Sequence, residues 1–226
     1  MKTNSIFYLV SIVLVLGSCA PAYVPNVINS PMLSEKMDLN IAGYTGTAGY
    51  DLQGAFAITD NIGIMVNGSF ADRTSDSTNS YHKHVFLEAG PGYFTKVGNS
   101  GIVEIYGGFG IGNVDSYYES SVFTNYANAT ISRIYLQPGV GFISDFFDGS
   151  FTSRFALVNI NQDQISETGL FVEPALTGKL GYKWVKFTGQ LGFSVPLNPD
   201  DIHFEYQPIM ISIGLQINLG SLLKQE

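Results

Sequence analysis

From residue 36 onward, apolar and polar residues alternate with a period of two, which is typical of β-strands with one buried face. In the stretch 102–112, Val103 and Ile105 lie on one face, whereas Glu104 and Tyr106 lie on the other. The pattern predicts ten strands, near residues 37–46, 50–59, 62–71, 83–94, 102–112, 131–143, 151–160, 169–178, 182–195 and 206–219. A tilted strand crosses a bilayer with about 9–11 residues, which is close to the length of these segments.

The connections between the predicted strands alternate in length. Short connections lie at 59–61, 95–100, 144–150 and 179–182. Long polar connections lie at 72–80, 113–130, 161–169 and 196–205. Such an asymmetry characterises outer-membrane barrels. We therefore expect an all-β fold, a closed antiparallel up-and-down transmembrane β-barrel of about ten strands over residues 36–220, with a tail at 221–226. Eight strands is the alternative, if the first two segments or the seventh are not strands.

Proline recurs within four of the predicted strands, at Pro91, Pro138, Pro174 and Pro208. Proline cannot donate a hydrogen bond to a ladder and is usually confined to edges, strand starts and bulges. The missing N–H therefore predicts a β-bulge or a break in the ladder at these prolines, with a bulge favoured at Pro208. Each bulge would add local twist and help the sheet to close.

Composition supports a membrane protein. Charged residues make up 13% of the 226 residues and hydrophobic residues 45%, which is about half the charge of a typical soluble domain. The net charge of −8 argues against a nucleic-acid partner. The chain has one cysteine, which excludes an internal disulfide.

The N-terminus is predicted to be a targeting segment. Residues 1–18 combine a positive charge at Lys2 with a short apolar run, as in a secretory signal peptide. The sequence Leu-Gly-Ser before Cys19 matches the pattern of a bacterial lipobox, which predicts cleavage before Cys19 and its lipidation. Residues 19–35 contain three prolines and are predicted to be an extended, lipidated tether.

The lipobox, the segment "YVPNVINSPMLSEK" and the strands of the "LQPGVGF" type resemble the small outer-membrane β-barrel lipoproteins of Bacteroidetes-type Gram-negative bacteria. The resemblance implies that Cys19 carries fatty acyl groups such as palmitate. Surface-exported lipoproteins of such bacteria often carry acids just after the cysteine, and this chain has none there. An anchor in the periplasmic leaflet is therefore expected. The C-terminal "GSLLKQE" departs from the aromatic end of many such barrels.

One charged residue falls on the polar side of each predicted strand from the fourth to the ninth, namely Glu88, Glu104, Arg133, Arg154, Glu173 and Lys186. Charges placed in this way would meet and pair inside a narrow barrel. Tyr106, Tyr135, Gln137 and Trp184 would add bulk to the lumen. Aromatic residues near the short-turn ends are expected to form an interfacial girdle, namely Tyr93, Phe94, Phe142, Tyr182 and Trp184.

Motifs for catalysis or cofactor binding are scarce. The chain lacks a P-loop, a zinc-type Cys/His cluster and a GxSxG motif. His82, His84 and His203 are interpreted as polar rim residues, in preference to metal ligands or a Ser/His hydrolase site. The stretch 198–205 is interpreted as a solvated acidic loop in preference to a calcium site. We therefore predict no catalytic residue, metal or cofactor.

The sequence thus predicts an outer-membrane protein that contacts membrane lipids. Its expected role is structural or surface interaction through the long loops, with an extracellular or periplasmic protein partner. One alternative is a lipid-anchored periplasmic calyx, in which the apolar rows would face inward onto an apolar ligand. Another is a lipid-modifying enzyme or a narrow pore. Low total charge favours the membrane protein.

Overall fold

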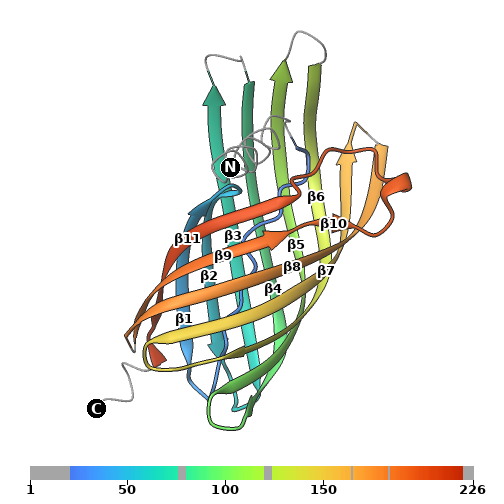
Figure 1. Ribbon diagram of the computed structural model, residues 1–226. Helices are drawn as coiled ribbons and strands as arrows, with labels where there is room; N and C mark the ends of the chain where they lie inside the picture. The colour runs from blue at the N-terminus through green and yellow to red at the C-terminus, as the bar shows by residue number, and fades with distance from the viewer. Residues whose placement is uncertain (1–20, 76–79, 120–123, 164, 183, 221–226) are drawn as a thin grey trace, which may run out of the picture.

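A computed structural model describes residues 21–220 apart from 76–79, 120–123, 164 and 183. In this part of the chain, ten strands form a closed antiparallel barrel (Figure 1). They are β1 (Leu39–Gly46), β2 (Gly49–Ala57), β3 (Ile62–Ser75), β4 (Ser80–Val97), β5 (Gly101–Glu119), β6 (Thr124–Phe142), β7 (Phe147–Gln162), β8 (Ile165–Tyr182), β9 (Val185–Phe193) and β11 (Ile209–Asn218). The prediction of ten strands is confirmed, and the eight-strand alternative is wrong.

Each strand of the barrel pairs with its neighbours in sequence, and β1 closes the ring by pairing with β11. A two-residue strand, β10 (Val195–Pro196), continues the pairing of β9 with β8. It is followed by a single 3-10 turn, η1 (Pro199–Asp201). Among the described residues, no helix is long and apolar enough to cross a membrane.

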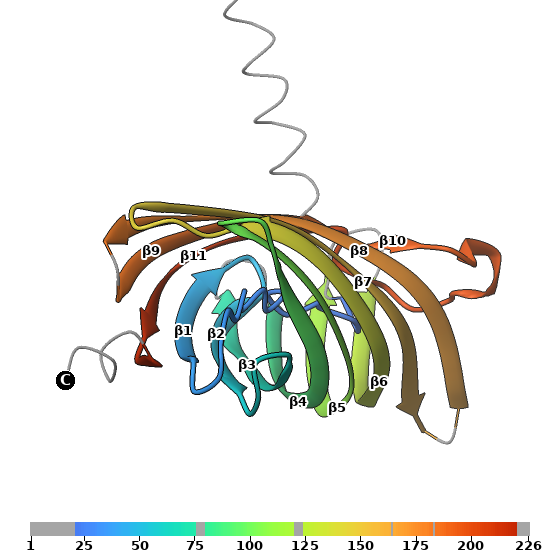
Figure 2. The same cartoon turned by 90° about the horizontal axis from the view of Figure 1, so that it is seen from below.

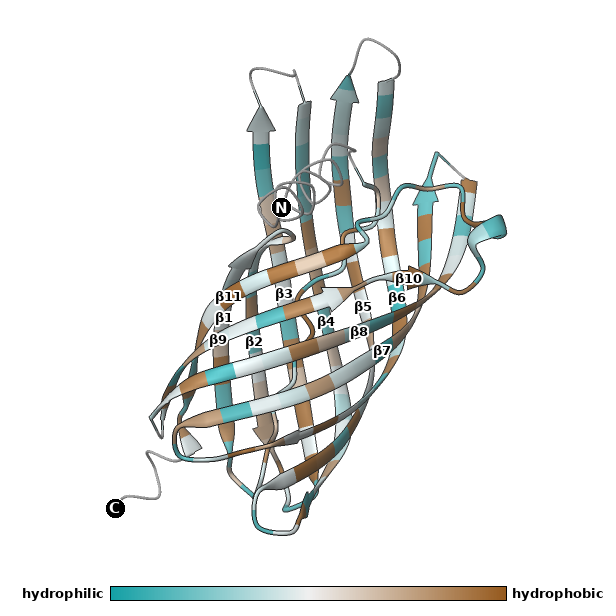
Figure 3. Cartoon of the chain, viewed as in Figure 1, coloured by the Kyte–Doolittle hydropathy of each residue, from teal (hydrophilic) through white to brown (hydrophobic). Residues whose placement is uncertain are grey.

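The outward face of the barrel is apolar and the inward face is polar. On β6, Ile134 and Leu136 are 61% and 50% exposed, whereas their neighbours Arg133 and Tyr135 are 1% and 3% exposed. Figure 3 shows the resulting alternation of hydrophobic and hydrophilic bands along the strands. This is the pattern of a transmembrane barrel. The calyx alternative is wrong, because it required the apolar rows to face inward.

One aromatic residue lies on the opposite side from the one predicted, and a second, predicted for both sides, lies on the outer side. Phe94, assigned to the outer girdle, is fully buried, and Trp184, assigned to the lumen as well as to the girdle, is 43% exposed. Tyr93, Phe142 and Tyr182 face outward near the short turns, as expected. The error at Phe94 arises from parity, since Tyr93 and Phe94 are adjacent and must point to opposite faces.

The strands from β3 to β8 are longer than the membrane requires, and three hairpins project beyond the rest of the barrel (Figure 1). The predicted loop 113–130 consists largely of the ends of β5 and β6, which stay paired as far as Glu119 and Thr124. The predicted loop 161–169 is likewise mostly strand. Polar hairpin sequences therefore continue the sheet where irregular loops were expected.

At Pro91, Pro138 and Pro174 the predicted break in the ladder is confirmed, whereas a bulge is not found. Past Pro91, Pro138 and Pro174, the register of each strand with both neighbours stays constant, so no residue is inserted. Pairing with the following strand is interrupted beside each proline, where an N–H is missing. Pro208 precedes β11, and the nearby Phe204 and Tyr206 pack against buried residues of the lumen.

The segment before β1 lies inside the barrel. Residues 21–34, which we call the luminal segment, run through the lumen from the long-hairpin end to the short-turn end (Figures 1 and 2). The segment is extended, as predicted, but it is not an external tether. The luminal segment begins at the long-hairpin end, where Tyr23 bonds to Glu205 and Gln207, whereas β11 ends at the short-turn end beside the start of β1. Cys19, the predicted signal peptide 1–18 and the tail 221–226 lie outside the described residues.

Candidate functional site

The luminal segment is the centre of the candidate site, because barrel side chains bind its main chain at successive positions. The carbonyl oxygens of Val27, Ile28, Asn29, Ser30 and Pro31 accept hydrogen bonds of 2.7–2.8 Å from Gln53, Gln190, Gln137, Lys179 and Asn40. The amides of Val27, Ile28 and Met32 donate to Asp51, Gln190 and Glu104. Buried peptide groups need partners. Over residues 27–32, side chains of the barrel strands supply these hydrogen-bond partners, and the segment does not pair with a strand.

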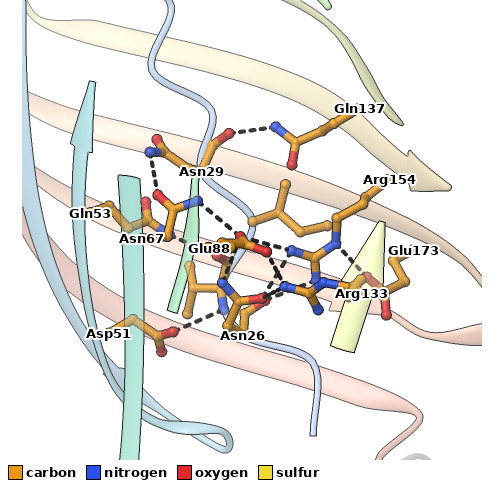
Figure 4. A network of polar contacts seen from close by, with 12 residues as sticks. Asn26, Asn29, Asp51, Gln53, Asn67, Glu88, Arg133, Gln137, Arg154 and Glu173 are labelled. Atoms are coloured by element: carbon orange, nitrogen blue, oxygen red, sulfur yellow. Dashed lines mark hydrogen bonds and ion pairs between the residues drawn. The ribbon is translucent and has the colours of Figure 1, made fainter. Parts of the chain in front are cut away.

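Four of the predicted luminal charges meet in one cluster at mid-barrel (Figure 4). Glu88, Arg133, Arg154 and Glu173 come from β4, β6, β7 and β8, and their side chains are at most 1% exposed. Arg133 pairs with Glu88, and the Nε of Arg154 lies 2.6 Å from Glu173. Arg154 also lies 3.5 Å from Glu88. Two positive and two negative charges balance, as burial of ions requires.

Two residues of the luminal segment complete this cluster. The Oδ1 of Asn26 accepts hydrogen bonds from Arg133 at 2.5 Å and Arg154 at 2.9 Å, and its Nδ2 donates to Glu88 at 3.0 Å. The hydroxyl of Tyr23 donates to Glu173 at 2.7 Å and accepts from Arg133 at 2.9 Å. The segment is therefore bonded to all four charges.

A second group lies nearer the short-turn end and also holds the segment. Glu104 accepts from the amide of Met32 at 3.0 Å and from the hydroxyl of Ser30 at 3.2 Å. Lys179, which was predicted to lie in a turn, donates to the carbonyl oxygen of Ser30 at 2.7 Å. Parity could have revealed Lys179, because Glu173, Thr177 and Lys179 occupy alternate positions on one face of β8.

Lys186 belongs to a third group, close to the short turns. Its Nζ lies 2.5 Å from Asp148 and donates to the carbonyl oxygen of Ser144 at 2.6 Å. Asp148 was also predicted to lie in a turn, but it lies within β7. The six predicted luminal charges therefore all face inward, but they divide among three groups.

His82 and His84 form a chain of hydrogen bonds with a serine near the long-hairpin end. Ser69 Oγ lies 3.0 Å from His84 Nε2, and His84 Nδ1 lies 2.9 Å from His82 Nε2. Burial and the charge of Arg73 lower the pKa of His82 to about 4, so this ring is neutral at pH 7. The adjacent cavity of about 10 Å³, which Tyr23 also lines, has room for about one water molecule. His203 lies elsewhere, beside a larger cavity.

Within the described residues, a larger cavity lies at each end of the lumen. A cavity of about 410 Å³ at the long-hairpin end is lined by Ala22, the hairpins and the connection before β11. Another of about 300 Å³ lies beside Met32 and Lys186 at the short-turn end. Across residues 21–220, as far as they are described, no group of His, Cys, Asp and Glu side chains is arranged to hold a metal ion.

Comparison with known proteins adds little to this geometry. No family model matches the chain, and no curated protein matches it either. Among solved structures, it is similar to OmpT (in-vitro folded), an outer membrane protein of Vibrio cholerae, with 7% identity and a TM-score of 0.22 over 84% of this chain and 100% of that chain. At this TM-score, the fold assignment rests on the strand pairing of the chain itself.

Proposed function

We propose that the protein is an outer-membrane β-barrel lipoprotein with a sealed lumen, which has a structural or surface-interaction role and no catalytic activity. The observation that carries the proposal is the bonding of the luminal segment to charged residues on four strands. A lumen occupied in this way resists opening, because removal of the segment would take hydrogen-bond partners away from the buried ions. Ten-stranded barrels also lie near the size at which side chains can fill the interior.

The decisive experiment is conductance in planar bilayers. The purified protein should give no steady conductance, and liposomes that contain it should take up no small solutes. Stable ohmic channels of nanosiemens size would support the narrow-pore alternative. As a check on membrane integration, the protein should remain in membranes after carbonate washing, and its gel mobility should change on boiling.

The hairpins of β3 to β6 are the proposed interaction surface. Tyr81 and Tyr117 stack on neighbouring strands with ring centroids 6.0 Å apart, and Tyr117 pairs in register with Tyr126. The hydroxyls of Tyr81 and Tyr117 donate to Asp115 and Glu119 at 3.0 Å. Ordered tyrosines are favourable contact residues at protein interfaces, so a protein partner is the proposed ligand. The apolar outward face of the barrel contacts outer-membrane lipids.

Lipidation of Cys19 remains part of the proposal and rests on the lipobox. A fatty-acid analogue should label the wild-type protein, and Cys19→Ser should remove the label and leave unprocessed precursor. Equal labelling of the two proteins would contradict lipidation. The barrel proposal would be unaffected by that result.

The hydrolase alternative is disfavoured by lack of space. The Ser69–His84–His82 chain is next to a cavity too small for a lipid substrate. Ser69→Ala should therefore leave the lipid composition of the outer membrane unchanged when the protein is expressed. A change in acyl composition that depends on Ser69 would support an enzyme.

A further inference from the structure

We infer that the luminal segment carries the N-terminal end of the chain across the membrane, so that the residues before Pro21 lie on the external side. The inference rests on the proposed function for one point, the assignment of the long hairpins to the external side. The remaining steps follow from contacts of the described residues.

The end of the luminal segment near Pro21 is fixed at the long-hairpin end. The amide of Tyr23 donates to the carbonyl oxygen of Glu205 at 3.0 Å, and the amide of Gln207 donates to that of Tyr23 at 3.0 Å. Tyr23 and Tyr206 thereby form a parallel bridge. Glu205 and Gln207 belong to the connection before β11, one of the long connections.

The other end is fixed equally firmly at the short turns. The carboxylate of Asp38 accepts hydrogen bonds from the amide and hydroxyl of Ser34 at 2.8 Å and from the amide of Glu35 at 3.1 Å. The amide of Lys36 donates to Asp60, in the short turn between β2 and β3, at 3.0 Å. The chain reverses there and enters β1.

Between these ends, the segment crosses the lumen once. Asn26 is bonded to the mid-barrel cluster, and Met32 is bonded to Glu104 nearer the short turns. Extended chain covers about 3.3–3.6 Å per residue. Residues 23–34 are therefore long enough to span a hydrocarbon core of about 30 Å.

The external end also has an exit. Ala22 lines the cavity of about 410 Å³, together with residues of the hairpins β5–β6 and β7–β8 and of the connection before β11. Chain that precedes Pro21 can leave the lumen through this space. Cys19 lies two residues before Pro21, and two residues reach at most about 7 Å. Any acyl group on Cys19 would then lie on the external side, not on the periplasmic side predicted from the sequence.

The test places one short epitope in three full-length variants. The first carries it between Ala20 and Pro21, which leaves the lipobox intact. Two matched controls carry it beside Asp163 in the β7–β8 hairpin and beside Asn99 in the β4–β5 turn. Intact cells are treated with external protease, and loss of each epitope is measured by antibody. A mobility shift on boiling verifies that each variant is folded.

We expect loss of the epitopes before Pro21 and at Asp163, with retention of the epitope at Asn99. Retention of the epitope before Pro21, while that at Asp163 is lost, would overturn the inference and leave the proposed orientation intact. Loss at Asn99 with retention at Asp163 would overturn the orientation, and the external N-terminus with it. If an insertion prevents folding, the substitutions Pro21→Lys, Ser166→Lys and Asn99→Lys provide the same comparison with trypsin.

Discussion

Strand β4 carries two ion pairs, only a few residues apart, in opposite surroundings. Glu88 faces the lumen, where its 1% exposed side chain contacts Arg133 and Arg154. Lys83 faces outward on the projecting hairpin, where it lies 3.4 Å from Asp72 and both side chains are about half exposed. The same kind of contact thus occurs once in a closed interior and once beside solvent.

This difference determines what each pair contributes. The exposed pair is screened by water and stabilises the fold by at most about 1 kcal/mol. The luminal cluster is desolvated, so loss of one member leaves an unpaired buried charge at a cost of about 3–5 kcal/mol. The buried charges of the lumen therefore contribute more to the stability of the fold than the exposed ion pair does.

The largest effect is expected from Arg154→Met, which leaves Glu88 short of one partner and Glu173 without its ion pair. The free energy of unfolding in lipid vesicles should fall by about 3–5 kcal/mol. Urea titration followed by tryptophan fluorescence measures this change. The double variant Arg154→Met/Glu173→Leu should recover part of the loss, and equal stability of wild type and single variant would contradict the importance of burial.

A second comparison moves a charge to the other face of a strand. Leu136→Arg places an unpaired cation among lipids and should cost about 2–4 kcal/mol. The matched control is Asn128→Arg, on the same face of β6 but in the projecting hairpin, where the cost should be near zero. Similar stabilities of the two variants, in the same titration, would argue against a membrane-spanning belt at Leu136.

Asn26→Ala tests the link between the cluster and the luminal segment. It leaves both arginines without an acceptor that they share, which should reduce stability by about 1–3 kcal/mol. The matched control is Asn161→Ala, an exposed asparagine of β7, which should change stability little. The free energies of unfolding of the two variants should therefore differ clearly, and equal values would show that the segment is not held through Asn26.

The smallest effect is expected at the exposed pair. Lys83→Met should lower the free energy of unfolding by no more than about 1 kcal/mol, and less at high salt. Urea titration at two salt concentrations measures both quantities. A fall in the free energy of unfolding as large as that caused by Arg154→Met would show that the exposed ion pair stabilises the fold as much as the buried one.

Much of the barrel could be predicted from the sequence, because successive side chains of a strand point to opposite faces, so that alternating polarity shows which side chains face the lumen and which face outward. The inward positions of Glu88, Arg133 and Glu173 follow from parity alone. The grouping of the charges could not be predicted in this way. It depends on strand stagger around the barrel, which places Glu104 and Lys186 at different heights from the cluster.

The position of the luminal segment was missed for a physical reason. Residues 21–34 contain three prolines and no regular alternation, so they resemble a linker. Their polar groups are bonded by side chains from distant strands, a pattern that has no local signature. The narrow interior of a ten-stranded barrel and the surplus of inward-facing Gln53, Gln137 and Gln190 are the signals that a chain lies within.

The seam between β1 and β11 constrains the order of assembly. It pairs Asn40 with Asn218, residues from opposite ends of the barrel sequence, and such distant contacts form slowly. The luminal segment carries buried side chains as large as Tyr23 and Ile28, which are packed on every side. Such a chain is far more easily enclosed than threaded. We therefore expect the luminal segment to be in place while the sheet is still open, so that the pairing of β1 with β11 closes the barrel around it.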